Sequence, residues 1–315
     1  MENPPLSQIL KIYAKLAGAN LSGATLKPAT ARKNVNSLKL ILRRAGIDPE
    51  AAHLTDLTPS VIDKWRQSSY ERAGLDFARP NPAKNSSLNA TLRQARSVFG
   101  ARALAEYARR KIRLPKTLDA FMQVADLKPE VRREFTPLSK DIDEQIRARA
   151  AASLEGKTGA ELPPPEAAAM IEMARYAGMT LREILFFRPE WVVETPSGTF
   201  INVAEDGEFT TKRCAKNRKI PVDPKRLKRW LKTIGETPLG DPHTPAQSEA
   251  YKCACRWLRE YMPNRTKKLH ELRKMACSDM LSRTGNIFLA ARFIGNSIDT
   301  TSKYYAGLLN DIKPL

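Results

Sequence analysis

The sequence predicts a mainly α-helical protein with one small antiparallel β-sheet (α+β), divided into two domains. Three observations carry this prediction. Apolar residues recur at helical spacing through the first half, strand-like runs flank Pro196-Ser197-Gly198, and helical spacing returns from about Pro224 onward. A chain of 315 residues is also long enough for two domains of ordinary size.

Helices joined by polar turns are expected through about the first 125 residues. Gly46 suits the C-cap of one helix, and Thr58-Pro59 suits the start of another, since threonine caps helices and proline fits the first helical position. Apolar positions that repeat every three or four residues mark these helices: Ile9, Ile12, Tyr13 and Leu16; Val35, Leu38 and Leu42; Val61, Ile62 and Trp65; Leu88, Leu92, Ala95 and Phe99. This half, residues 1–115, is the predicted N-terminal helical domain.

The predicted linker covers residues 116–130, and the second domain covers residues 131–315. Leu162-Pro163-Pro164-Pro165 stops any helix, so the next helix should begin at Glu166. Residues 191–194 and 199–203 read as a hairpin, and Lys219-Ile220-Pro221-Val222 reads as a third strand.

The charge balance indicates a polyanionic partner. Lys+Arg number 53 against 34 Asp+Glu, which gives a net charge of +19. Such a surface attracts nucleic acid, whereas solubility alone is served better by acidic residues. The stretch from Lys212 to Lys232 holds ten Lys/Arg and one acid, on a hairpin arm and a helix start that fit DNA. The residues expected to contact DNA are Arg213, Arg218, Lys219, Lys267, Lys268, Arg93 and Arg96.

Several protein classes are excluded by pattern. No apolar run approaches the ~20 residues that span a bilayer, and the N-terminus lacks the features of a secretory signal. The four cysteines, with Cys253-Ala254-Cys255 too closely spaced, do not form a zinc pattern. We therefore expect a cytoplasmic, nucleoid-associated protein with reduced thiols, no membrane contact and no metal.

Candidate catalytic residues lie near the C-terminus. His270 and Arg273 are three residues apart, so they share a helix face. An arginine can clamp two phosphate oxygens and a histidine can move a proton, so this pair suits a phosphodiester. Gly295-Asn296-Ser297 and Thr300-Thr301-Ser302-Lys303-Tyr304-Tyr305 follow.

Together these motifs resemble those of the tyrosine recombinase (phage integrase) family. The family carries His-x-x-Arg, a Leu-Gly-His-Ser-type turn, and Thr-Thr-x-x-Tyr with the nucleophile; here the matches are His270, Arg273, Gly295 to Ser297, and Tyr304. Residues 176–184 resemble its Thr-Gly-Leu-Arg-x-x-Glu-Leu box, and residues 212–221 its lysine-bearing hairpin. The resemblance implies an N-terminal core-binding (SAM-like) domain and a recombinase catalytic domain, acting as a homotetramer on paired sites in double-stranded DNA.

The implied mechanism needs no cofactor. Tyr304 attacks the scissile phosphate, forms a 3′-phosphotyrosyl link and releases a 5′-hydroxyl. Arg273 and a second arginine hold the non-bridging oxygens, while His270 assists proton transfer. Lys212 or Lys216 protonates the leaving oxygen. Tyr305 is an adjacent alternative to Tyr304.

Two positions depart from the family pattern. The first catalytic arginine falls on Thr180, which also begins a capping box with Glu183; Arg182, two residues on, could substitute only after a rearrangement. Asn296 stands where the family has His or Trp, and the segment from Asn296 to Tyr304 is one residue shorter than is common.

These departures leave a second hypothesis open, in which the chain is a recombinase-fold DNA-binding protein that has lost strand cleavage. A type IB topoisomerase is a further alternative. Leu308, Leu309, Ile312 and Leu315, after the tyrosines, could dock on a neighbouring protomer or pack within the same chain.

Overall fold

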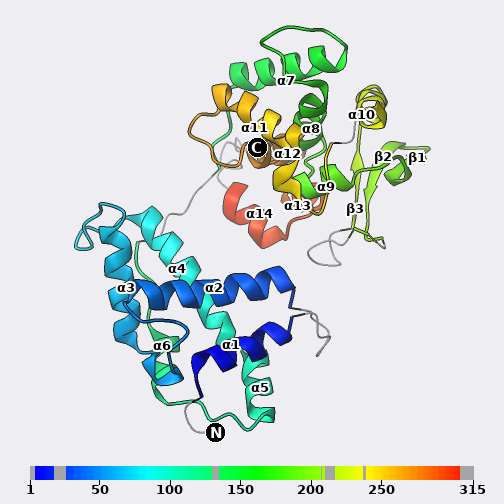
Figure 1. Cartoon of the computed structure of the whole chain (residues 1–315). Coiled ribbons are helices and arrows are strands. Elements are labelled where there is room, and N and C mark those ends of the chain that lie inside the picture. Colours follow the sequence, from blue (N-terminus) through cyan, green and yellow to red (C-terminus); the bar gives the residue numbers. More distant parts are fainter. Residues whose placement is uncertain are drawn as a thin grey trace. The chain divides into compact units, whose positions relative to one another are not determined.

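A computed structural model describes residues 4–17, 26–129, 135–206, 208–209, 217–236 and 239–305. The chain divides into two compact units, Met1–Arg132 and Arg133–Leu315, and each unit closes its own hydrophobic core. Figure 1 shows that the described part of the first unit is helical, whereas the second adds a small sheet to its helices. This is the mainly helical α+β class predicted from the sequence.

The first unit is built on a packed pair of long helices, α2 and α4. Leu38, Ile41 and Leu42 of α2 are completely buried, and α4 places Leu92 opposite them in the same core. Pro28, Pro59 and Pro82 each begin a helix, where the missing N–H costs nothing. The helices are α1 (Leu6–Lys15), α2 (Pro28–Arg44), α3 (Pro59–Glu71), α4 (Pro82–Arg96), α5 (Ala101–Arg109) and α6 (Thr117–Gln123), with 3₁₀ turns at Leu54–Asp56 and Ser97–Phe99.

The segment expected to be the linker belongs to the first unit. Residues 116–130 contain α6, whose Leu118 and Phe121 are buried in the core of that unit. The chain after α6 is held by Asn89, whose side chain donates to the Leu127 carbonyl and accepts from the Leu127 N–H, both at 2.9 Å. The apolar contacts of α6 therefore extend the first unit beyond residue 115.

The second unit surrounds one central helix, α8. Every residue from Ala167 to Arg175 is buried, because α7, α10, α11 and α12 all pack against α8. A helix that is apolar nearly all round needs this kind of coverage. The helices are α7 (Lys140–Leu154), α8 (Pro165–Tyr176), α9 (Leu181–Phe186), α10 (Pro224–Glu236), α11 (Glu249–Tyr261), α12 (Lys268–Thr284), α13 (Ile287–Ile294) and α14 (Ile298–Tyr305), with 3₁₀ turns at Pro189–Trp191 and Pro245–Gln247.

The sheet has three antiparallel strands in the order β1 (Val192–Thr195), β2 (Gly198–Val203) and β3 (Arg218–Pro221). Val192 pairs with Ile201, and Ile201 pairs with Ile220. The third strand begins at Arg218, one residue before its expected start. Side chains alternate along a strand, so Arg218 points inward with the fully buried Ile220, while Lys219 points outward.

Among the described residues, no helix combines the length and apolar character needed to cross a bilayer.

Candidate functional site

The site is organised around Arg273, which lies on α12 and is only 4% exposed. Its Nη1 donates to the carbonyl of Gly178, and its Nη2 donates to the carbonyl of Ile294. Arg273 therefore connects the loop before α9 with the C-terminal end of α13. Glu183 on α9 approaches the same guanidinium, with 3.7 Å between Glu183 Oε2 and Arg273 Nη1.

A second buried arginine, Arg218, shares this glutamate. Its Nη1 and Nη2 donate to the two carboxylate oxygens of Glu183 at 2.8 and 2.9 Å, and its Nε donates to the Phe293 carbonyl at 2.9 Å. The inward position on β3 buries the Arg218 side chain in this ion pair, and its contact with DNA stays a prediction. We call Arg218, Arg273 and Glu183 the guanidinium cluster.

The cluster carries two cations and one anion at neutral pH. Burial opposes the charge of Glu183, but the hydrogen bonds and charge of Arg218, with the charge of Arg273, outweigh burial and lower the pKa of Glu183 to about 2. Burial lowers the pKa of Arg273 to about 10, Glu183 opposes that shift, and Arg218 adds to it. Both pKa values lie far from 7, so Glu183 and Arg273 remain charged.

The turn after α13 lies directly against the cluster. Gly295 has a φ of 61°, the left-handed conformation that ends many helices, and the Asn296 N–H donates back to the Ala291 carbonyl at 2.9 Å. A Cβ on Gly295 would also come within 3.0 Å of Arg218 Nη1. Glycine is therefore required here by the backbone and by the neighbouring guanidinium.

Other parts of the C-terminal motif have structural roles. Ser297 Oγ accepts from the Thr300 N–H at 3.2 Å and so caps the start of α14. Thr301 is fully buried, and its hydroxyl donates to the Ser297 carbonyl at 3.1 Å. Asn296, between the glycine and the cap, stays partly exposed.

The two adjacent tyrosines occupy different environments. Tyr304 is 38% exposed, whereas Tyr305 is 3% exposed and packs against Phe135 with ring centroids 5.5 Å apart. The Tyr305 phenol is hydrogen-bonded to Cys277, which lies one turn after Arg273 on α12. Burial raises the pKa of Tyr305, and the nearby charge of Arg273 opposes that rise. The structure thus places the Tyr305 phenol on the Cys277 thiol, one helical turn after Arg273.

His270 lies on the first turn of α12 and is exposed in the free chain. Desolvation by its neighbours, with repulsion from Arg273 and Lys274, lowers its pKa to about 4. The imidazole is therefore neutral at pH 7 and can accept a proton.

The structure separates Arg182 from the guanidinium cluster. Its guanidinium lies over the rings of Phe186 and Phe209, 5.2 and 5.5 Å from their centroids. Thr180 forms the capping box expected from the sequence: its hydroxyl accepts from the Glu183 N–H at 3.3 Å, and Glu183 accepts from the Thr180 N–H at 2.7 Å. Arg182 therefore contacts two phenylalanine rings, and its role at the phosphate stays a prediction.

Two further DNA-contact predictions meet structural roles instead. Lys268 is buried, and its Nζ donates to the Arg265 carbonyl at 2.8 Å. Arg96 Nη2 donates to two carbonyls of the chain around α6, at 2.9 and 2.7 Å. Both side chains bind backbone carbonyls of their own unit, and their contact with DNA stays a prediction.

The remaining predicted contacts differ in exposure. Lys219 and Lys267 are exposed. Arg93 is 53% exposed and pairs with Asp126 at 2.7 Å. Lys212, Arg213 and Lys216 lie outside the described residues.

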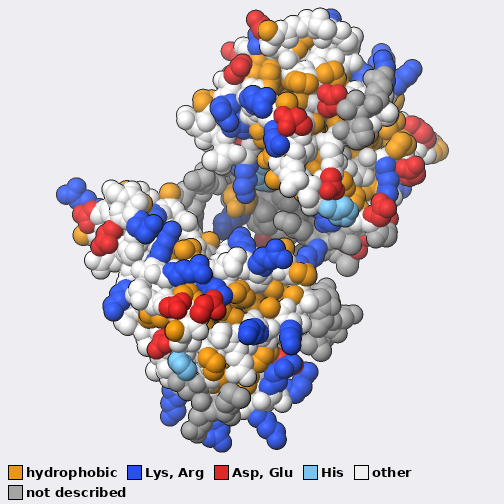
Figure 2. Space-filling model, viewed as in Figure 1, with side chains coloured by type: hydrophobic (Ala, Val, Ile, Leu, Met, Phe, Trp, Pro, Cys, Tyr) orange, Lys and Arg blue, Asp and Glu red, His pale blue; other side chains and the backbone are white. Residues whose placement is uncertain are grey.

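The sequence predicted only part of a basic face on the first unit: Arg93 and Arg96 of α4 were expected to contact DNA, whereas the basic residues of α2 were not. Helices α2 and α4 together hold eight Lys/Arg and no Asp or Glu, and Figure 2 shows blue side chains over these helices. Arg32 and Lys33 are exposed and line, with Asn36, Thr91 and others, a groove of about 370 Å³ between α2 and α4. The absence of acids from both helices was the available sequence signal.

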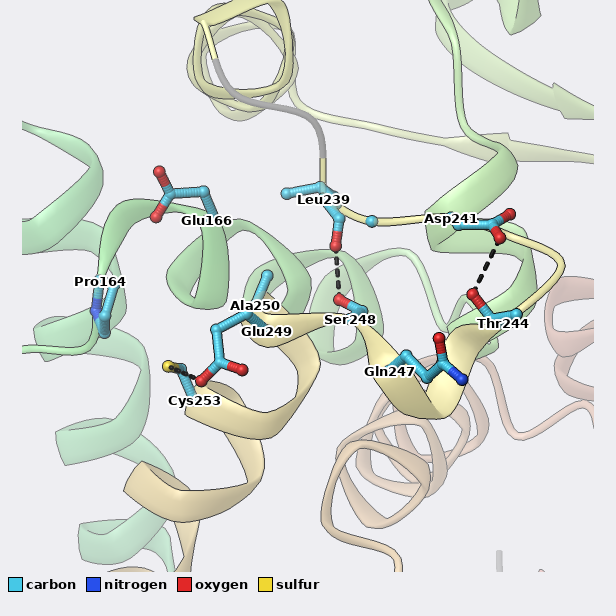
Figure 3. A pocket seen from close by; sticks show the side chains of 11 residues that line it. Pro164, Glu166, Leu239, Asp241, Thr244, Gln247, Ser248, Glu249, Ala250 and Cys253 are labelled. Carbon is cyan, nitrogen blue, oxygen red and sulfur yellow. Dashed lines mark hydrogen bonds between the residues drawn. The ribbon is translucent and has the colours of Figure 1, made fainter.

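A larger cavity of about 610 Å³ lies in the second unit but is chemically unsuited to phosphate. The α8 start, the loop 239–248 and the first turns of α11 enclose it (Figure 3). Glu166, Asp241 and Glu249 line it, so its charge would repel an anion. No group of three or more metal-ligating His, Cys, Asp or Glu side chains occurs in the part of the chain that the structure describes.

The chain has the fold of the integrase class of tyrosine recombinases. The integrase of the Tn1549 transposon, solved with a circular intermediate DNA, superposes with a TM-score of 0.58 at 13% identity and 94% coverage of both chains. Lambda integrase bound to a COC′ core site gives 0.59 at 17% identity, covering 100% of this chain and 81% of that one. The sequence itself matches no family model and no curated protein.

Proposed function

We propose that this chain binds duplex DNA and breaks and rejoins its strands through a tyrosine, as a site-specific recombinase. The observation that carries the proposal is the guanidinium cluster, which lies against the Gly295 turn, with the Tyr305 phenol bound to Cys277 one helical turn after Arg273. A net positive charge next to a tyrosine suits displacement at a phosphodiester, where negative charge grows on the phosphoryl oxygens. The fold shared with integrases solved on DNA supports the same substrate.

The basic face of α2 and α4 supports duplex binding by the first unit. Its Arg and Lys side chains have no carboxylate on either helix to neutralise them. Phosphate contacts of this kind provide affinity without sequence selection. The second unit adds the exposed Lys219 and Lys267.

Tyr305 is the nucleophile that the geometry favours, rather than Tyr304. It lies beside Arg273, while Tyr304 is directed to solvent. The segment from Asn296 to Tyr304 is one residue shorter than is common in the family, and counting to Tyr305 restores the length. Because Tyr305 is buried and bound to Cys277 in the free chain, DNA binding must release its phenol before attack.

In the proposed reaction the tyrosine Oη forms a bond to the scissile phosphorus while the P–O5′ bond breaks. Arg273 stabilises the phosphoryl oxygens. The neutral imidazole of His270 accepts the phenolic proton, and the 5′ oxygen takes a proton from an acid, for which Lys212 and Lys216 are the candidates. The phosphotyrosine retains the bond energy for rejoining. Exchange between two duplexes would need paired sites and four protomers.

The test is a covalent-adduct assay. Duplexes selected by the protein from a random library are nicked so that the cleaved end diffuses away, and denaturing gels then reveal any protein–DNA adduct. We expect an adduct that Tyr305→Phe abolishes and Tyr304→Phe retains. An adduct lost only with Tyr304→Phe would return the nucleophile to Tyr304.

A second candidate function is DNA binding without cleavage. Thr180 is occupied by helix capping, and Arg218 and Arg273 are held by internal acceptors. Tight, salt-sensitive binding with no adduct on any selected, nicked site would favour this function.

A further inference from the structure

Among the described residues, the two buried arginines of the cluster share one carboxylate, so the cluster carries a net positive charge. Arg218 and Arg273 are each 4% exposed, and both lie near one carboxylate, that of Glu183. The next acid along α12, Glu271, is already paired with Arg265 at 3.0 Å and Lys274 at 2.7 Å. A buried charge without a counter-ion is costly, so the cluster is suited to an anion.

The two arginines also bind consecutive backbone carbonyls. Arg218 donates to the Phe293 carbonyl, and Arg273 donates to the next one, that of Ile294. Both groups therefore grip the carboxyl end of α13, immediately before the Gly295 turn. Position 180, where a first clamp arginine would be expected, holds a threonine that caps α9.

We propose that Arg218, on β3, supplies the second positive charge of the phosphodiester site in place of an arginine at position 180. This inference rests on the proposed strand-cleavage function. Displacement at a phosphodiester places negative charge on two non-bridging oxygens, and one guanidinium compensates only part of it. The second cation of the site would thus come from β3 instead of the start of α9, and it would be paired with Glu183.

Arg218 acts as a positioning residue and a fixed charge. Because Arg218 is buried, its guanidinium is not expected to contact the phosphate of bound DNA directly. The backbone of Gly295, without a side chain, lies over its guanidinium. A phosphate held at this turn would be attracted by the charge of Arg218, because a low-dielectric site screens that charge only weakly.

The first experiment compares Arg218→Gln with Arg175→Gln in the full chain. Arg175 is the matched control: it is also 4% exposed and makes a bidentate pair, with Asp143 at 2.7 and 2.7 Å, but outside the cluster. Adduct formation is timed on nicked duplexes that carry either a phosphate or an uncharged methylphosphonate at the cleaved position. The dissociation constant for DNA and the melting temperature are measured for each variant.

On the phosphate substrate, Arg218→Gln should slow adduct formation about 100-fold, with DNA affinity close to wild type. The methylphosphonate removes one negative oxygen, so the deficit should shrink to about 10-fold or less. Arg175→Gln should lose melting temperature without this dependence on substrate charge. Equal deficits of Arg218→Gln on both substrates, or the same pattern in both variants, would overturn the proposal.

Two additions keep the test decisive. If Arg218→Gln does not fold, Arg218→Lys replaces it: the loss of the fixed guanidinium fork should slow the phosphate reaction about 10-fold and leave the methylphosphonate reaction unchanged. If the wild type forms no adduct at all, the proposed function fails, and Arg218 is judged by inorganic phosphate alone. Phosphate should then raise the melting temperature of wild type and Arg175→Gln more than that of Arg218→Gln or Arg218→Lys; an equal rise in all would refute the role.

Discussion

Glu183 is the residue on which the site depends most. It caps α9 through the Thr180 N–H and holds Arg218 in a bidentate pair. One carboxylate therefore fixes the helix start, strand β3 and the neighbourhood of Arg273. Removing one partner of a buried ion pair leaves the other uncompensated, which typically costs about 3–5 kcal/mol.

We predict that Glu183→Gln lowers the free energy of unfolding of the second unit by about 3 kcal/mol at pH 7. The folded-state pKa of about 2 lies below the unfolded value of roughly 4.3. The ionised Glu183 therefore stabilises the folded state above pH ~4.3, and this stabilisation is lost as pH falls toward 2. Urea unfolding of wild type and Glu183→Gln between pH 7 and pH 3 should show that the difference in their free energies of unfolding becomes smaller as pH falls. A difference that stays constant would contradict the low pKa of Glu183.

At the residue scale, spacing predicted which residues share a helix, while their catalytic roles stay predictions. His270, Arg273, Glu183 and the two tyrosines could be found by spacing, since local spacing fixes which residues share a helix. The partner of Glu183 could not, because Arg218 is 35 residues away and only the packing of β3 against α9 and α13 brings it there. The one available indication in the sequence was strand alternation, which places Arg218 on the same inward side of β3 as Ile220.

Among the elements, α2 and α4 form the proposed DNA-binding face of the first unit. Their inner faces form its core, and neither helix holds an Asp or Glu, although Lys39 pairs with Glu50 and Arg93 pairs with Asp126 outside the helices. Helical periodicity predicted both helices. The α2 part of the basic face was missed because the face is assembled from two helices more than 30 residues apart along the chain.

We predict that the double variant Arg32→Ala/Lys33→Ala weakens binding to all duplexes alike. It should lower the slope of log K against log salt by about 2, because each phosphate contact releases counter-ions. The control is Arg109→Ala/Arg110→Ala on α5, which removes the same charge from residues paired with Glu106. An unchanged slope in the α2 variant, or an equal fall in the control, would exclude this face.

Across the whole molecule, the chain divides into two compact units. Each core is closed by residues of its own unit, and α6 completes the first one. The two-domain organisation and helical class followed from periodicity and length. The boundary was placed too early because α6 is short, with seven residues, and lies in a charged stretch typical of a linker.

We predict that residues 1–132 and 133–315, produced separately, each unfold cooperatively in urea. A fragment 1–115 should not, because it lacks the buried Leu118 and Phe121 of α6. Circular dichroism of the three fragments tests this directly. Cooperative unfolding of 1–115 with undiminished stability would show that α6 is dispensable.

The central claim is that this chain cleaves DNA strands through Tyr305, whose phenol lies one helical turn from Arg273. The most direct measurement is peptide mapping of the adduct formed on nicked duplexes selected by the protein itself. The account predicts a nucleotide attached to Tyr305 and an adduct lost in Arg273→Gln. Tight binding of the same duplexes with no attached nucleotide on either tyrosine would contradict it.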